Sequence, residues 1–217
     1  GIGSQKWQEM KNNPLVDEKV IPFSVADMEF RLAPEITEGL KKFIDDNILG
    51  YAGTNKKYRE SVCKWQQKHH DFTVDEKWLV ETHSVVNAFF TAVKAFTQKG
   101  DGVMLFTPVY YPMYKAIEIN QRKLVEIPLI NNSMTYDIDW DLFTKKAKAI
   151  DTKMLILCSP HNPCGRIWTR EELTKISEIC LANDILVVAD EIHADLIMPG
   201  FKHVSYGTIS KEALEHS

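Results

Sequence analysis

The sequence predicts an α/β fold, a three-layer sandwich in which helices cover both faces of a mostly parallel sheet. Two continuously apolar runs, residues 154–157 and 185–189, are typical of strands buried on both faces. Between them, Thr169 and Glu172 stand three residues apart as a capping box, which predicts that a helix begins there. A strand, a helix and a strand in this order form a βαβ unit, so we expect the two strands to be parallel with a right-handed crossover.

The preceding residues supply further elements. Residues 78–81 predict a short strand, and residues 85–97 predict a helix with apolar side chains on every face, which is typical of a buried helix. A turn at residues 99–102 leads to a buried strand at residues 103–106, and residues 123–127 predict another strand. If these strands are parallel, the segments that follow them meet at one edge of the sheet.

Composition narrows the class of protein. The chain has 217 residues, with 44% hydrophobic residues and a net charge of −4, which is typical of a globular protein and excludes disordered and collagen-like classes. No run of five Lys or Arg occurs, so we expect no nucleic-acid partner. The apolar runs are too short to span a bilayer and no secretion leader is recognised, so we expect no membrane partner. The four cysteines are expected to be thiols, which favours a cytoplasmic protein.

One cysteine cluster imitates the spacing of zinc ligands. Cys158, His161 and Cys164 are each three residues apart. However, Cys158 ends an apolar run, two prolines stiffen the interval, and no second Cys or His pair follows at finger spacing. We therefore predict no metal site.

Polar and aromatic side chains follow the predicted strands, at the edge where ligands bind in open α/β sheets. Seen singly, each residue has an ordinary explanation. Asn162 suits a turn, Tyr110 suits core packing, and Ser84 suits a helix cap. Asp190 suits an N-cap or a salt bridge to Arg166.

Taken together, these residues match pyridoxal 5'-phosphate (PLP), which has a protonated ring nitrogen, a phenolate oxygen, a flat ring and a phosphate. Asp190 would pair with the ring nitrogen, Asn162 would bind the phenolate oxygen, and Tyr110 would stack on the ring. A helix N-terminus attracts the phosphate. The backbone amides expected there belong to Ser84, Val85 and Val86.

The strings Asn162-Pro163-x-Gly165 and Asp190-Glu191-Ile192-His193 resemble those of the class I/II aminotransferase superfamily of fold-type I PLP enzymes. Further strings make the chain similar to the MalY/PatB-like cystathionine β-lyase (carbon–sulfur lyase) branch. These strings lie at residues 25–30, 50–51, 108–112, 160–169 and 190–196. The resemblance runs from Lys6 to Ser205 and implies the large domain of a PLP-dependent transferase-like fold.

The resemblance implies the same roles for the residues already assigned to PLP and adds others. The residue matching Ile192 packs against the second ring face, and His193 stands where many relatives place a tyrosine that contacts the phenolate oxygen. The residue matching Tyr51 reaches the phosphate of a neighbouring subunit, which implies a homodimer with shared active sites. Ala26 and Asp27 match a segment near the substrate carboxylate.

Two departures from the family are expected to matter. Ser84 occupies the place of a usual glycine, where a side chain restricts the backbone of the phosphate cradle or adds a hydroxyl contact. The lysine that holds PLP as a Schiff base has no counterpart, because Lys202 and Lys211 fall too early and Lys211 suits a solvated position near a helix start. We therefore assign no catalytic residue and expect a fold that is incomplete at the C-terminus.

The expected domains are residues 1–44, which belong with the small domain, and residues 45–217, a truncated large PLP-binding domain. The implied activity is α,β-elimination from a small sulfur amino acid, giving a thiol, pyruvate and ammonia, with the 217-residue chain alone inactive. An aminotransferase is the alternative, because both reactions pass through a carbanion at Cα. A non-catalytic regulatory or partner-binding fragment is an alternative of another class. A dinucleotide-binding domain is disfavoured because no Gly-x-Gly-x-x-Gly string occurs.

Overall fold

The computed structural model describes residues 3–17, 19–23, 25–51 and 53–217. The chain divides into two compact units, residues 1–53 and residues 54–217. The described residues of the first unit form two helices, α1 (Gln5–Lys11) and α2 (Pro34–Asp46). Proline suits the start of α2 because the first residues of a helix have no partner for their N–H groups. The predicted division into domains at residues 44 and 45 stays a prediction.

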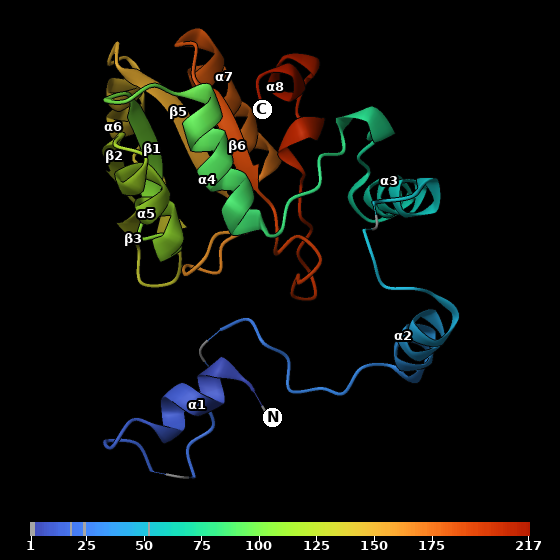
Figure 1. Cartoon of the computed structure of the whole chain (residues 1–217). Helices are drawn as coiled ribbons and strands as arrows, with labels where there is room; N and C mark the ends of the chain where they lie inside the picture. The colour runs from blue at the N-terminus through green and yellow to red at the C-terminus, as the bar shows by residue number, and fades with distance from the viewer. Residues whose placement is uncertain (1–2, 18, 24, 52) are drawn as a thin grey trace. The chain divides into compact units, whose positions relative to one another are not determined.

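The second unit is built on a parallel sheet with the strand order β2-β1-β5-β6 (Figure 1). Its strands are β1 (Gly102–Thr107), β2 (Lys123–Pro128), β5 (Thr152–Cys158) and β6 (Leu186–Asp190). The helices are α3 (Lys56–His70), α4 (Val85–Phe96), α5 (Tyr111–Ile119), α6 (Trp140–Ala147), α7 (Arg170–Ala182) and α8 (Lys211–Glu215). The smaller elements are β3 (Ile130–Asn131), β4 (Tyr136–Asp137) and the 3₁₀ helices η1 (Glu76–Trp78) and η2 (Tyr206–Thr208).

Helices cover both faces of this sheet. Successive residues of a strand point to opposite faces, and along β1 the side chains of Val103 and Leu105 join one core while Met104 and Phe106 join the other. The first core includes residues of α4 and α5, and the second includes residues of α6, α7 and α8. The predicted three-layer α/β architecture is confirmed.

The βαβ unit forms as its local signals predict. The Thr169 hydroxyl accepts the backbone N–H of Glu172, and the Glu172 carboxylate accepts the backbone N–H of Thr169 at 2.8 Å, so the capping box is complete. β5 and β6 pair in parallel, and Cys158 lies opposite Asp190 at their carboxyl ends. None of the described helices has the length and apolar character needed to cross a membrane.

The prediction of a strand at residues 78–81 is wrong. Trp78, the first of these residues, is the last residue of η1, and the Arg59 guanidinium donates to the carbonyl oxygens of Glu76 and Leu79 at 3.1 Å each. Backbone groups of this segment thus bond to a side chain rather than to a neighbouring strand. The four strands of the parallel sheet are β2, β1, β5 and β6, and residues 78–81 are not among them.

The expectation that the helix at residues 85–97 is buried on every side is also wrong. Phe89 and Val93 of α4 are buried against the sheet, whereas Phe96 is exposed. The helix is an outer layer of the sandwich, so only one of its apolar faces is covered by the described residues.

Candidate functional site

Three loops meet at the carboxyl edge of the sheet. The Ser159 N–H, just beyond β5, donates to the carbonyl oxygen of Asp190 at 2.9 Å. The Nε2 atom of His161 lies 2.9 Å from the carbonyl oxygen of Pro108, in the loop after β1. These contacts bring the loops that carry Tyr110 and Asn162 to the edge where Asp190 lies.

Asp190, the last residue of β6, is a buried carboxylate with 7% exposure. Its Oδ1 atom accepts the backbone N–H of Ile192 at 3.2 Å. Burial raises the pKa of Asp190 and the charge of Glu191 adds to this, while the Ile192 N–H and His193 oppose it in part. Among the described residues, no cationic side chain forms an ion pair with Asp190. The carboxylate therefore lacks the positive partner that burial calls for.

Arg166, the cation considered from the sequence, binds elsewhere. Its guanidinium pairs with the Glu172 carboxylate at 2.5 Å and lies over the Trp168 ring at 4.6 Å. A salt bridge between Arg166 and Asp190 is thus not the explanation for this buried acid.

Tyr110 and Asn162 lie in the two loops that the His161 contact joins. Tyr110 is half-buried directly before α5, and burial, Tyr111 and the charge of Asp190 all raise its pKa. The backbone N–H of Asn162 donates to the Cys158 Sγ atom at 3.3 Å. No described residue hydrogen-bonds the Asn162 side-chain amide, so its donor and acceptor are available to a ligand.

Helix α4 begins at the same edge. It ends at Phe96 and β1 starts at Gly102, so this short connection makes the helix antiparallel to the strand and places its N-terminus at the strand's carboxyl end (Figure 1). The first N–H groups of a helix lack intrahelical partners. Those of Val85 and Val86 are therefore suited to an anion.

The structure corrects one expectation about Ser84. Its backbone is extended, with φ at −165°, a conformation open to any residue, so a side chain imposes no restriction on this turn. The hydroxyl accepts the backbone N–H of Asn87 at 3.1 Å and so caps α4. Serine therefore replaces glycine here without strain.

Ile192 and His193 lie two and three residues after Asp190; the first is exposed and the second half-buried. The roles predicted for them at the ring and the phenolate oxygen stay predictions.

Tyr51, Ala26 and Asp27 belong to the unit formed by residues 1–53. All three are exposed. The Ser4 hydroxyl donates to the Asp27 carboxylate at 2.9 Å, and the Lys6 ammonium donates to the backbone carbonyl oxygen of Asp27 at 2.5 Å. Their roles toward phosphate and substrate stay predictions.

The residues of the zinc-like string do not share one ligand-binding point. Burial raises the pKa of Cys158 to about 12, so this buried thiol is neutral at physiological pH. His161 turns to Pro108. In the described part of the chain, no group of three or more His, Cys, Asp or Glu side chains is placed to hold a metal ion. The four cysteines are free thiols, as expected.

The two late lysines are surface residues. Lys202 pairs with Asp71 at 2.7 Å and Lys211 with Glu215 at 3.6 Å, and both lysine side chains are exposed. The sequence-based interpretation of Lys211 as a solvated lysine near a helix start is confirmed.

Sequence reasoning missed the bridging role of His161. The side chain is only 2% exposed, and it joins two loops of the candidate site. Its position in the loop that also carries Asn162, directly after a buried strand, could have indicated this role. The zinc-like spacing favoured a comparison with metal ligands instead.

The fold and this edge define an α/β domain that offers a buried carboxylate, an aromatic ring, a free amide and a helix N-terminus to a cofactor. The family model for aminotransferase class I and II matches residues 18–214. The chain therefore belongs to the class I and II aminotransferase family.

Individual relatives narrow the comparison. The chain is 39% identical over 212 residues to cystathionine β-lyase PatB of Bacillus subtilis, covering 98% of this chain and 54% of the relative. The crystal structure of cystalysin from Treponema denticola, which contains PLP, superposes with a TM-score of 0.96 and 44% identity, covering 100% of this chain and 55% of that one. The PLP-bound C-S lyase from Staphylococcus hominis gives a TM-score of 0.82 and 32% identity, with 89% and 49% covered. The chain spans about half the length of the curated relatives it matches.

Proposed function

We propose that the chain forms the PLP-binding portion of a carbon–sulfur β-lyase that acts on small sulfur amino acids such as cystathionine. The observation that carries the proposal is Asp190, a buried carboxylate without a cationic partner in the described chain. A protonated pyridine nitrogen supplies that partner. The similarity to PatB, cystalysin and the C-S lyase supports this choice of cofactor and reaction.

The other residues at the edge fit the remaining parts of PLP. The free amide of Asn162 is suited to hydrogen-bond the phenolate oxygen, and Tyr110 is suited to stack on one face of the ring. Ile192 would pack against the other face, and His193 would lie near the phenolate oxygen. The phosphate suits the amides at the start of α4, where the helix dipole contributes about 0.3–1 kcal/mol. That set is Ser84, Val85 and Val86.

When bound, PLP supplies an electron sink for the electrons released at the Cα atom of an amino acid. The residues of this chain prepare the site for that chemistry. Asp190 holds the proton on the ring nitrogen, because an adjacent cation favours its ionised form against the effect of burial. Tyr110 and the loop held by His161 would shield this ion pair from water, which would strengthen it. No residue of the chain is assigned as the base, so we propose binding without turnover for the 217 residues alone.

We further propose a cytoplasmic homodimer with shared active sites. In it, Tyr51 would contact the phosphate bound by the neighbouring subunit, and Ala26 and Asp27 would lie near the substrate carboxylate. The support is the resemblance of residues 25–30 and 50–51 to the lyase branch.

The test of the cofactor is a calorimetric titration of the chain with PLP. We expect saturable binding, and at least about tenfold weaker binding by Asp190→Asn, because the buried charge pair is lost. Asp184→Asn is the matched control, since it makes the same chemical change at an exposed position just before β6. Absence of PLP binding, or equal binding by Asp190→Asn, would refute the proposal.

The reaction requires the whole protein. We expect it to release pyruvate from cystathionine faster than it transfers the amino group to a keto acid. The aminotransferase alternative is favoured by the description of the matching family. Predominant amino transfer would replace the lyase assignment with that alternative and leave the PLP site in place.

A further inference from the structure

The segment that follows β6, residues 191–206, forms a loop whose two ends are held together by Glu191. The Oε1 atom of Glu191 accepts the backbone N–H of Tyr206 at 2.6 Å. The Oε2 atom of the same carboxylate lies 3.3 Å from Nε2 of His203, a side chain buried to 5% exposure. One carboxylate thus closes residues 191–206 into a loop at its base.

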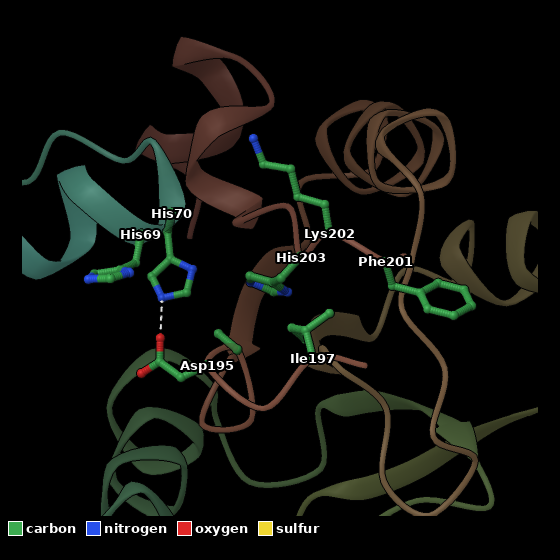
Figure 2. A pocket seen from close by; sticks show the side chains of 8 residues that line it. His69, His70, Asp195, Ile197, Phe201, Lys202 and His203 are labelled. Carbon is green, nitrogen blue, oxygen red and sulfur yellow. Dashed lines mark hydrogen bonds and ion pairs between the residues drawn. The ribbon is translucent and has the colours of Figure 1, made fainter. Parts of the chain in front are cut away.

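The outer part of this loop is attached to α3. The Oδ1 atom of Asp195 lies 2.7 Å from Nε2 of His70, and the Trp65 indole donates to the same carboxylate at 3.1 Å. Figure 2 shows His70 directed at Asp195, with His203 next to them. The rings of His70 and His203 meet edge to face with centroids 5.7 Å apart. His70, Asp195 and His203 are among the residues that line a cavity of about 220 Å³.

The loop also carries residues of the candidate site. Asp190 directly precedes Glu191, and the N–H of Ile192, the next residue, donates to the Asp190 carboxylate. A second carboxylate beside a buried one is electrostatically unfavourable. The hydrogen bond from the Tyr206 N–H and the nearby His203 ring provide the structural reason for an acceptor of this length at position 191.

We infer that Glu191 is a positioning residue for the candidate cofactor site, which it holds in place by closing the 191–206 loop, with the Asp195–His70 pair as the second attachment. This inference rests on the proposed function. Glu191 fixes the backbone between Asp190 and Ile192, and so orients the acid and the residue that covers the ring. It acts through these neighbours and touches neither substrate nor cofactor.

The test compares Glu191→Ala with Glu191→Gln and with Glu178→Ala, an exposed glutamate on α7. Two readouts are needed, the dissociation constant for PLP and the hydrogen exchange of the Ile192 and Tyr206 amides. We expect Glu191→Ala to exchange faster at both amides and to bind PLP about tenfold more weakly. Glu191→Gln keeps an acceptor for Tyr206 and should recover most of the affinity. Glu178→Ala should match the wild type in both measurements.

The two readouts separate this inference from the function on which it rests. Failure of the wild type to bind PLP refutes the function, while unchanged exchange at Ile192 in Glu191→Ala overturns the positioning role by itself. Equal PLP affinity in wild type and Glu191→Ala, measured on folded protein, also overturns it. If Glu191→Ala does not fold, Asp195→Ala takes its place. Faster exchange at Ile192 with weaker PLP binding in Asp195→Ala supports the inference, and wild-type values in both refute it.

Discussion

The Nε2 atom of His161 lies 2.9 Å from the carbonyl oxygen of Pro108, a residue 53 positions earlier in the chain. This contact joins the loop after β1 to the loop after β5. Tyr110 lies two residues beyond Pro108, and Asn162 is the neighbour of His161. A single buried imidazole thus holds together two residues of the candidate PLP site.

Replacement of His161 by alanine should lower the free energy of unfolding by about 1–3 kcal/mol, because the Pro108 carbonyl oxygen loses its closer donor and keeps only the Cys164 thiol at 4.0 Å. PLP binding should weaken as well, since the loops of Tyr110 and Asn162 are no longer joined. Urea denaturation and PLP titration measure the two effects. His69→Ala, at an exposed histidine, is the control. Wild-type stability in His161→Ala would show that the contact contributes nothing.

The same residue predicts a pH dependence. Burial lowers the pKa of His161 below its usual 6.5, although its backbone contacts oppose this in part. The imidazole of His161 therefore takes up a proton more readily in the unfolded chain than in the folded chain. The contribution of neutral His161 to stability is fully present above the usual pKa and is lost as the pH falls below it. Urea midpoints between about pH 7 and about pH 5 should fall less steeply in His161→Ala than in wild type. Parallel curves would contradict the prediction.

Asp190→Asn should affect stability and binding in opposite directions. Burial raises the pKa of Asp190, so the folded chain holds the proton more tightly than the unfolded chain. The ionised carboxylate therefore destabilises the fold increasingly as the pH rises from its usual pKa of 3.8 through the folded value. Without PLP at neutral pH, Asp190→Asn should be more stable by about 1 kcal/mol. A loss of stability in thermal unfolding would show that the carboxylate has a partner in the free protein.

Ser84 should act as a helix cap whether or not PLP binds. Ser84→Ala should cost about 1 kcal/mol of stability and Ser84→Gly only a few tenths, because glycine tolerates an N-cap position better than alanine does. Thermal unfolding in the absence of PLP measures both. Equal stability of the alanine and glycine variants would argue against the bond to the Asn87 amide.

Thr169→Ala should destabilise the βαβ unit by about 1 kcal/mol, since the N-cap of α7 is lost. Thr169→Ser keeps the hydroxyl and should recover most of this loss. The comparison requires only equilibrium unfolding in urea. If the serine variant is as unstable as the alanine variant, packing of the threonine methyl group rather than capping explains the effect.

Much of the second unit was predictable because its signals are local. The capping box at Thr169 and Glu172 and the apolar runs of β5 and β6 identify their elements without knowledge of distant residues. The prediction of a strand at residues 78–81 was wrong because a strand depends on a neighbouring strand, which is not a local signal. In the structure the Arg59 side chain, rather than a strand, bonds to backbone carbonyl oxygens of this segment. The burial of α4 was overestimated because an apolar face does not specify what covers it.

The sequence by itself determined the α/β class, the family resemblance and the meeting of Tyr110, Asn162 and Asp190 at one edge. It did so because parallel strands bring their carboxyl ends together and strand signals lie within each segment. Only the tertiary structure decided that Asp190 lacks a cation, that His161 bridges two loops and that Glu191 closes a third. Those contacts join residues far apart in the chain, and which side chains meet there depends on packing that no local pattern encodes.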